Sequence, residues 1–144
     1  PVRYIEELLL VKGISPALLF GEGDQKGLAD YLTVYGDTGK VNFNTAPLLV
    51  VKSFDPSISD ELLEKLDEYR RDEENQESLA NQDWYKQVNG WPGDITINSQ
   101  LLTITSNYFQ IIAIGEFDTL SRSVVAVVER SDESGVTLLG KKTE

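Results

Sequence analysis

The sequence contains neither cysteine nor histidine, and these two absences exclude several kinds of chemistry. Without cysteine the chain forms no disulfide and has no thiolate to act as a nucleophile or as a zinc ligand. Without histidine it lacks imidazole acid–base catalysis, Ser-His and Cys-His nucleophile pairs and histidine-ligated metals. Catalysis by carboxylates, lysine or tyrosine remains open.

Methionine is also absent, so the chain, which starts at Pro1, carries no initiator residue. We therefore expect it to be a piece of a longer protein, whose signal or membrane anchor, if it has one, is not in this sequence. No apolar run approaches the ~20 residues of a membrane-spanning helix.

Basic residues are scarce: the sequence has 13 lysines and arginines but 24 aspartates and glutamates, which gives a net charge of -11. This balance argues against electrostatic binding to nucleic acid or to anionic lipid, because both need a basic surface. Residues 60–83 carry ten of the acids and three of the bases. We interpret this stretch as a solvated helix face and loop, with an acidic surface for a partner as the alternative.

The two halves of the chain differ in character, which predicts an α+β fold. Residues 1–92 are typical of a small helical domain, and residues 93–144 of an antiparallel β-meander with short hairpins. The longest helix is expected after Ser59, with Leu62, Leu63 and Leu66 on its buried side and Arg70 and Arg71 at its end. Further helices are expected at residues 3–12, from Ser15, at 45–54 and at 81–88, and strands at 101–105, 108–117, 123–129 and 136–139.

A turn-forming motif consisting of Asn42, Asn44, Thr45, Ala46 and Pro47 precedes an apolar run. Asparagine is a favoured N-cap residue, and proline is tolerated in a first helical turn because its missing N–H would have no partner there. The motif therefore predicts a helix that begins at Thr45, is capped by Asn44 and runs to about Phe54.

Two helix–turn–helix pairs, one around Gly13 and one around Asp55, give the first half the outline of helix-hairpin-helix or SAM-like domains. Some proteins of that class bind DNA through the N–H groups of glycine-rich hairpins. The second hairpin here has no glycine, and it places Asp55 where a phosphate would sit. Together with the negative net charge, this favours a structural or protein-binding role and no nucleic-acid partner.

Acidic loops and helix carboxylates offer little specific chemistry. No segment has the alternating oxygen ligands of an EF-hand loop, so ordinary turn acids are the favoured interpretation, with a calcium site as the alternative. No phosphate-binding glycine loop is present, and surface carboxylates on a helix are normally solvated, so we expect no enzyme. The loop acids that could bind calcium are Glu22, Asp24, Asp94, Asp118, Asp132 and Glu133.

Several segments, in order, resemble the minor pseudopilin K family of the type II secretion system, also called the general secretion pathway. The segment Val41–Pro47 is similar to the family's "vNvNTAp" signature, and Thr105–Ile111 resembles its "S.yF.v" strand. The other matching segments are 6–14, 28–34, 127–130 and 135–136. The matches run in the same order over about four-fifths of the chain, although the Asn-Thr-Ala-Pro type of motif also occurs in helix-hairpin-helix competence proteins.

The resemblance implies a structural component of the pseudopilus, which drives folded proteins through the outer membrane. Members of the family have an N-terminal hydrophobic helix and a pilin-like sheet into which a large helical domain is inserted, and they cap the pseudopilus with the I-type and J-type minor pseudopilins. This chain would then be a C-terminal fragment from the periplasmic face of the inner membrane, with the membrane contacted only through a helix that this sequence lacks. Some relatives bind calcium, but the resemblance assigns no ligands here. An extracytoplasmic helix-hairpin-helix adaptor of a related pilus system is the alternative.

The expected sheet is apolar on both faces, so each face must pack against another structural element. The helical half can supply one such element, through Trp84, Tyr85 and Trp91, and in a pilin-like fold the N-terminal helix supplies the other. We therefore expect a partly bare strip at which that helix or a partner docks and through which the fragment self-associates weakly. The strip consists of Phe109, Ile111, Ile112, Ile114, Val125 and Val127.

Overall fold

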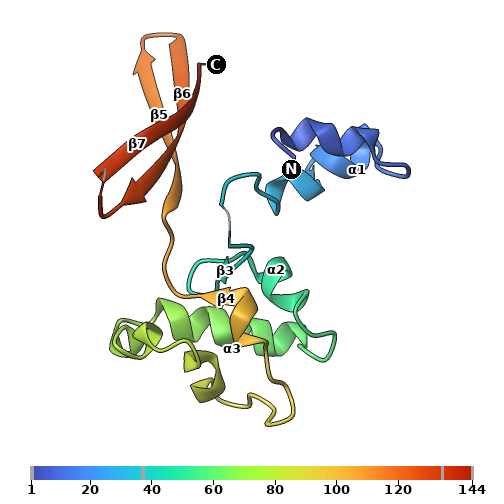
Figure 1. The fold of residues 1–144 in the computed structure, drawn as a ribbon, viewed down its shortest axis with the longest axis vertical. Coiled ribbons are helices and arrows are strands. Elements are labelled where there is room, and N and C mark those ends of the chain that lie inside the picture. Colours follow the sequence, from blue (N-terminus) through green and yellow to red (C-terminus); the bar gives the residue numbers. More distant parts are fainter. Residues whose placement is uncertain (1, 37, 134, 144) are drawn as a thin grey trace. The chain divides into compact units, whose positions relative to one another are not determined.

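The computed structural model describes residues 2–36, 38–133 and 135–143. Helices account for 31% and strands for 28%, and the predicted α+β class is confirmed. The chain divides after Ile104 into two compact units, a helical unit followed by a sheet unit (Figure 1). Each unit is described by itself.

The first part of the helical unit is a small lobe that ends at residue 30. The 3₁₀ helix η1 (Ile5–Leu10) occupies the expected first helix, and it buries none of its residues. Helix α1 (Pro16–Phe20) begins as predicted, because the Ser15 hydroxyl accepts a hydrogen bond from the Leu18 N–H at 3.1 Å. The strands β1 (Gly21–Glu22) and β2 (Gln25–Lys26) pair antiparallel, and the 3₁₀ helix η2 (Leu28–Asp30) follows.

Two glycines allow this lobe to close. Gly21 has a φ of +80°, and a Cβ there would lie 2.0 Å from the backbone oxygen of Gln25. A Cβ on Gly27 would lie 2.3 Å from both the Gly21 nitrogen and the Leu19 oxygen. The backbones of the two ends of the hairpin therefore meet at a distance that only glycine permits.

The remainder of the helical unit is built around helix α3 (Asp60–Arg71), which the sequence predicts closely. Its N-cap is Ser59, whose hydroxyl accepts from the Leu62 N–H at 3.2 Å, and Leu62, Leu63 and Leu66 are buried. The other elements of this part are β3 (Val41–Asn42), α2 (Leu48–Lys52), η3 (Glu73–Asn75), η4 (Ser78–Ala80), η5 (Trp84–Gln87), η6 (Ser99–Leu101) and β4 (Leu102–Thr103).

Aromatic side chains fill the centre of this unit. Phe43, Trp84 and Tyr85 are fully buried, and the Phe43 ring lies 5.9 Å from that of Trp84 and 5.4 Å from that of Tyr85. Tyr69 stacks on Trp84 with ring centroids 5.6 Å apart and planes inclined by 6°. These rings join segments that are distant in the sequence, since Phe43 and Trp84 lie 41 positions apart.

Residues 93–104 belong to the helical unit, whereas the sequence assigned them to the sheet. Ile95, Ile97 and Leu102 are buried in the aromatic core. In addition, β4 pairs in parallel with β3, with Val41 opposite Leu102. Hydrophobic burial and this ladder therefore hold the segment with the helices, and the boundary lies after Ile104 rather than after residue 92.

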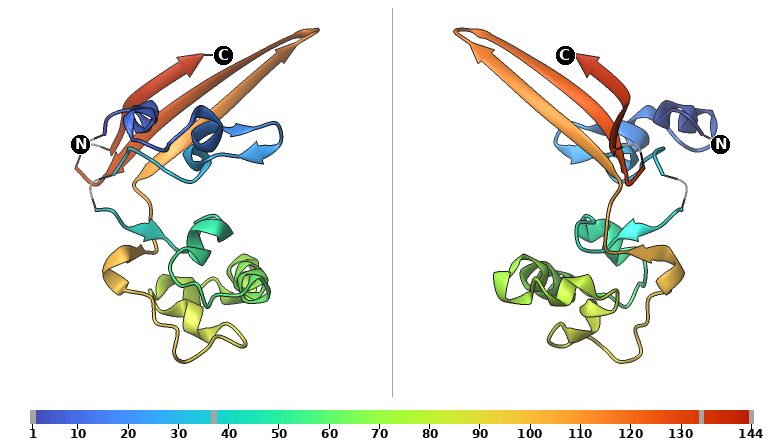
Figure 2. Two further views of the ribbon diagram at one scale, coloured as in Figure 1. Left: turned by 90° about the vertical axis from the view of Figure 1, so that its right-hand side faces the viewer. Right: turned by 60° about the vertical axis from the view of Figure 1, so that its left-hand side comes forward.

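The sheet unit is an antiparallel meander of three strands, as predicted. Its strands β5 (Tyr108–Phe117), β6 (Leu120–Ser131) and β7 (Gly135–Thr143) lie side by side in this order (Figure 2). The first hairpin turns through Asp118 and Thr119, so that Phe117 lies opposite Leu120. A register shift between Val127 and Val128 interrupts the pairing of β6 with β7.

Candidate functional site

Helix α2 begins at Leu48, and the prediction that Asn44 caps a helix starting at Thr45 is wrong. The residue at the N-cap position is Pro47, which provides no side-chain hydrogen bond. Residues 43–46 form a turn in which the Thr45 and Ala46 N–H groups donate to the backbone oxygen of Asn42, at 3.2 and 2.8 Å. The side chain of Asn42 accepts from the Asn44 N–H at 3.1 Å and so closes the turn.

The Asn44 side chain instead links three distant segments of the helical unit. Its Nδ2 group donates to the backbone oxygens of Leu79 and Ile104, at 3.1 and 3.2 Å. Its Oδ1 accepts from the indole N–H of Trp84 at 2.7 Å. Both amide hydrogens and the carbonyl are thus used. The opposite orientation of the amide would place its oxygen against the two carbonyl oxygens and its NH2 group against the indole N–H. Asn44 is therefore a polar junction of the core.

Arg70 holds the same motif from the side of α3. Its Nη1 donates to the backbone oxygens of Phe43 and Ala46, at 3.3 and 2.8 Å. Its Nε and Nη2 donate to Asp67 Oδ1, and only 9% of the Arg70 side chain is exposed. A guanidinium with such low exposure is stable here because a carboxylate and two carbonyls satisfy its N–H groups.

Sequence reasoning missed the role of Arg70, which it assigned to the end of the helix dipole. The signal was present in the spacing, because Arg70 follows Leu63 by seven residues and Leu66 by four. A residue at these intervals lies on the buried face of the helix, whatever its charge. Within the motif, Phe43 and Ala46 are buried, while Thr45 and Pro47 are exposed. The motif therefore organises the core and presents little surface to a partner.

The register of the sheet divides the predicted apolar strip between two faces. Residues directly opposite each other in an antiparallel pair share a face, and successive residues alternate. Ile112 lies opposite Val125, and Val127 and Ile114 share their face by alternation. Phe109 and Ile111, which lie opposite Val128 and Ala126, point to the other face. The six residues therefore form two separate strips.

The two faces also differ in charge. The face of Phe109 carries Arg122, Arg130 and Lys141, and the Arg130 guanidinium lies 5.3 Å from the centroid of the Phe109 ring. The face of Ile112 carries Glu116, Glu129 and Lys142, and Glu129 accepts a hydrogen bond from the Tyr108 hydroxyl at 2.8 Å. One face is thus apolar and basic, and the other is apolar with two acids and one base.

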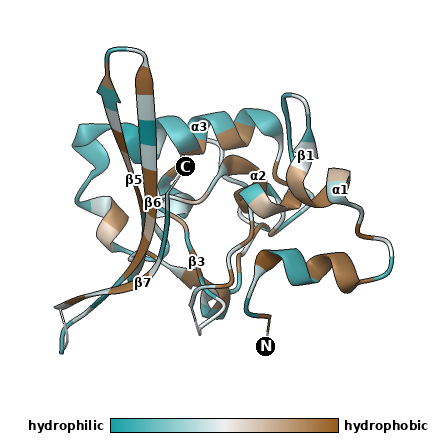
Figure 3. Ribbon diagram, turned by 90° about the horizontal axis from the view of Figure 1, so that it is seen from above, coloured by the Kyte–Doolittle hydropathy of each residue, from teal (hydrophilic) through white to brown (hydrophobic). Residues whose placement is uncertain are grey.

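None of the described residues between 105 and 143 is buried. The exposed fractions of Phe109, Ile111, Ile112 and Ile114 are 40, 51, 60 and 65%, whereas Val125 and Val127 are half-buried. Hydrophobic residues recur along β5 and β6 (Figure 3). A sheet with this much exposed apolar surface is typical of an interaction surface.

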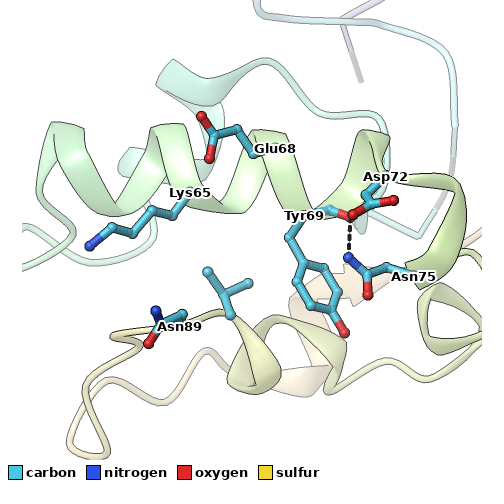
Figure 4. Close-up of a pocket in the computed structure, with 7 residues that line it drawn as sticks. Lys65, Glu68, Tyr69, Asp72, Asn75 and Asn89 are labelled. Carbon is cyan, nitrogen blue, oxygen red and sulfur yellow. Dashed lines mark hydrogen bonds between the residues drawn. The ribbon is translucent and has the colours of Figure 1, made fainter.

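A shallow hollow of about 350 Å³ lies beside α3 (Figure 4). Tyr69, at its wall, donates its hydroxyl to Gln87 at 3.1 Å and shares a hydrogen bond with Ser78, and Asn75 Nδ2 donates to the Tyr69 backbone oxygen. These polar groups serve the packing of the helical unit, and we assign no chemistry to the hollow. The lining residues are Lys65, Glu68, Tyr69, Asp72, Asn75, Val88 and Asn89.

Charged side chains along α3 form local ion pairs. Lys65 Nζ lies 2.7 Å from Glu61 Oε1, and this hydrogen bond, followed by the charge of the ammonium, lowers the pKa of Glu61. Asp67 accepts from both Arg70 and Arg71. Ion pairs within the helical unit thus engage Glu61 and Asp67, and likewise Asp60 with Lys52 and Asp83 with Lys86.

In the hairpin before α3, two backbone N–H groups donate hydrogen bonds to Asp55 of the same hairpin. The Asp55 carboxylate accepts the Ser57 N–H at 2.8 Å, and the Ile58 N–H donates to the Asp55 backbone oxygen. Two of the N–H groups that a phosphate would use are therefore already engaged.

Across residues 2–36, 38–133 and 135–143, no three acidic side chains gather closely enough to hold a metal ion. In the same ranges no helix has both the length and the apolarity to cross a membrane. Comparisons of the chain with protein families, with curated proteins and with solved structures find no match.

Proposed function

We propose that this chain is a structural subunit of a type II secretion pseudopilus, of the minor pseudopilin K type. In this role it acts by assembly with the I-type and J-type minor pseudopilins at the tip of the pseudopilus, on the periplasmic face of the inner membrane. Export of folded proteins across the outer membrane then depends on it. We propose no catalytic role and no nucleic-acid partner.

The observation that carries this proposal is how the chain enters and leaves the core of the helical unit. Strand β3 leads into it and β4 leads out, and the two are hydrogen-bonded neighbours, with Phe43 N–H donating to Thr103 O at 2.9 Å. A domain inserted into a sheet has this property, because its two ends must return to adjacent points. The resemblance implies such an insertion for the pseudopilin K family.

Two further features support the proposal. The family-like motif Val41–Pro47 supplies β3 and the Asn44 junction, so its residues are explained by the fold of the helical unit rather than by catalysis. The sheet unit, which begins at the second family-like segment, exposes apolar residues on both faces. A subunit whose work is to be packed among others needs such surfaces.

The proposal is tested by co-purification with the I-type and J-type minor pseudopilins encoded near its gene. We expect a stable ternary complex, and we expect deletion of the gene to block secretion of folded cargo. Normal secretion and normal pseudopilus assembly in the deletion strain would refute the proposal. Phe109→Ser, which alters the exposed sheet, should weaken the complex. Thr45→Ser, which alters an exposed residue of the motif, is the matched control and should leave the complex intact.

A helix-hairpin-helix adaptor of a related pilus system is the second candidate. The observation that favours it is the pair α2 and α3, joined by the hairpin that Asp55 closes. An adaptor would bind its partner through this helical pair and would tolerate polar substitutions in the sheet. The adaptor would be favoured over the pseudopilin if Phe109→Ser still binds its partner and Leu49→Ser does not. Leu49 lies on the exposed side of α2.

A further inference from the structure

The two edges of the sheet unit are protected to different degrees. The β7 edge carries Lys141 and Lys142, and a bulge interrupts its pairing with β6. Lysines and bulges are the devices by which proteins prevent edge-to-edge pairing. Strand β5 has neither device, its only charge is Glu116, and its ten residues pair with β6 in unbroken register. The β5 edge is therefore open to a further strand.

The hydrogen-bond pattern identifies which residues of β5 face outward. The Arg130 N–H donates to the Asn107 oxygen at 2.7 Å, and these two residues lie opposite each other in the register of β5 and β6. They are thus a hydrogen-bonded pair, and such pairs recur at every second residue along the ladder. The odd-numbered residues of β5 therefore direct their backbone groups to β6, and the even-numbered residues direct theirs to the free edge.

Four of these even-numbered residues, Gln110, Ile112, Ile114 and Glu116, form the open edge. In the described part of the chain, none of them has a backbone hydrogen bond to another segment. Their side chains are exposed. The edge therefore offers four N–H groups and four carbonyls at regular spacing to one incoming strand.

The sequence of β5 is complementary to itself across this edge. In an antiparallel pair of two copies centred on Ala113, Gln110 lies opposite Glu116 and Ile112 lies opposite Ile114. Each of the four outward residues of one copy then forms a hydrogen-bonded pair with one of the four outward residues of the other copy. The four pairs give roughly eight N–H···O bonds. Between them, Phe109 lies opposite Phe117 and Ile111 opposite Gly115, where a Cβ would find open space. Amide meets carboxylate, apolar meets apolar and no like charges oppose each other.

We propose that two copies of this chain associate through their β5 edges to form one continuous six-stranded sheet. The two-fold axis lies perpendicular to the sheet beside Ala113, so each face of one copy continues into the same face of the other. One pair of strands buries less than the ~1,200 Å² of stable interfaces, so the dimer is weak and reversible. This contact is independent of the proposed function.

The test uses the full chain in sedimentation equilibrium over a range of protein concentrations. We expect a monomer–dimer equilibrium whose Kd rises at least tenfold in Gln110→Glu, because a carboxylate then opposes Glu116 of the other copy. Gln110→Lys, the matched control, should keep or lower the Kd. The double variant Gln110→Glu/Glu116→Gln exchanges the two partners and should restore the dimer.

A second measurement reads the edge directly. Amide exchange by NMR should show that the Ile112 and Ile114 N–H groups become protected as the protein concentration rises, while the protection of Ala113 stays constant. A strictly monomeric chain at millimolar concentration would overturn the proposal. Equal effects of Gln110→Glu and Gln110→Lys, or self-association that Gln110→Glu leaves unchanged, would place the contact elsewhere and also overturn it.

Discussion

The helical unit and the sheet unit differ in how much of their apolar surface they bury. Among the residues that the structure describes, the fifteen buried hydrophobic ones all lie between Leu19 and Leu102, within the helical unit. The sheet unit is rich in isoleucine and valine, yet its most exposed large residues include Phe117, at 81%, and Ile114, at 65%. The first unit encloses an apolar core in its own chain, although some of its side chains, such as Leu10 at 87%, stay exposed. The second unit has no such core, and its apolar residues lie exposed or half-buried on strands joined by hairpins.

The difference shows what each unit contributes to function. Short helices and turns can fold around one aromatic centre, because polar junctions such as Asn44 and Arg70 satisfy the backbone groups that irregular structure leaves unpaired. A single layer of three strands has no enclosed core, so its apolar residues are stabilised by cross-strand neighbours alone until something packs on a face. The helical unit thus has a core of its own, whereas none of the described residues of the sheet unit is buried.

The largest expected effect is a difference between the denaturant concentrations at which the two units unfold. Both tryptophans, Trp84 and Trp91, lie in the helical unit, so their fluorescence reports on that unit alone. We expect β-sheet circular dichroism to be lost at a lower denaturant concentration than the tryptophan signal, because the sheet lacks buried side chains. Coincident transitions at dilute protein concentration would show that the two units unfold as one.

The next effect tests the polar junction. Asn44→Ala leaves the Trp84 indole N–H and the carbonyls of Leu79 and Ile104 without their partner. We expect the free energy of unfolding of the helical unit, measured by tryptophan fluorescence, to fall by about 3 kcal/mol. The exposed neighbour substitution Thr45→Ala should change it by less than about 0.5 kcal/mol. Equal values for the two variants would contradict the role assigned to Asn44.

A local effect is expected in the N-terminal lobe. In Gly27→Ala the new Cβ meets backbone atoms of Gly21 and Leu19 that no side-chain rotation can move. We expect a cost of about 1–3 kcal/mol, typical of overpacking, seen as faster amide exchange in residues 19–30. Gly93→Ala is the control, since a Cβ there meets nothing within 4 Å. Unchanged exchange in the lobe would refute the close approach.

The smallest effect compares two tyrosines of the aromatic core. Within the described residues, the buried hydroxyl of Tyr85 has no hydrogen-bond partner. Tyr85→Phe should therefore leave the free energy of unfolding unchanged or raise it by up to about 1 kcal/mol. Tyr69→Phe should lower it by about 1 kcal/mol, because the Tyr69 hydroxyl bonds to Ser78 and Gln87. Thermal unfolding of both variants checks this difference in sign.

The sequence by itself determined the features that depend on neighbouring residues. Ser15 and Ser59 cap helices because a hydroxyl and an N–H three residues later are brought together by local geometry. The spacing of Leu62, Leu63 and Leu66 defines the buried face of α3, and the short connector at 118–119 joins two strands into a hairpin. The α+β class and the order of helices before strands follow from these local rules.

Only the tertiary structure decided what the same residues do across long distances. Asn44 had the composition of a cap, but Trp84, Leu79 and Ile104 offered its amide three partners from other segments. Residues 93–104 alternate like strands, yet the aromatic core gave Ile95 and Ile97 a place to be buried. Alternation along β5 already separates Phe109 and Ile111 from Ile112 and Ile114. Only the register with β6 decided which of these two faces carries Val125 and Val127.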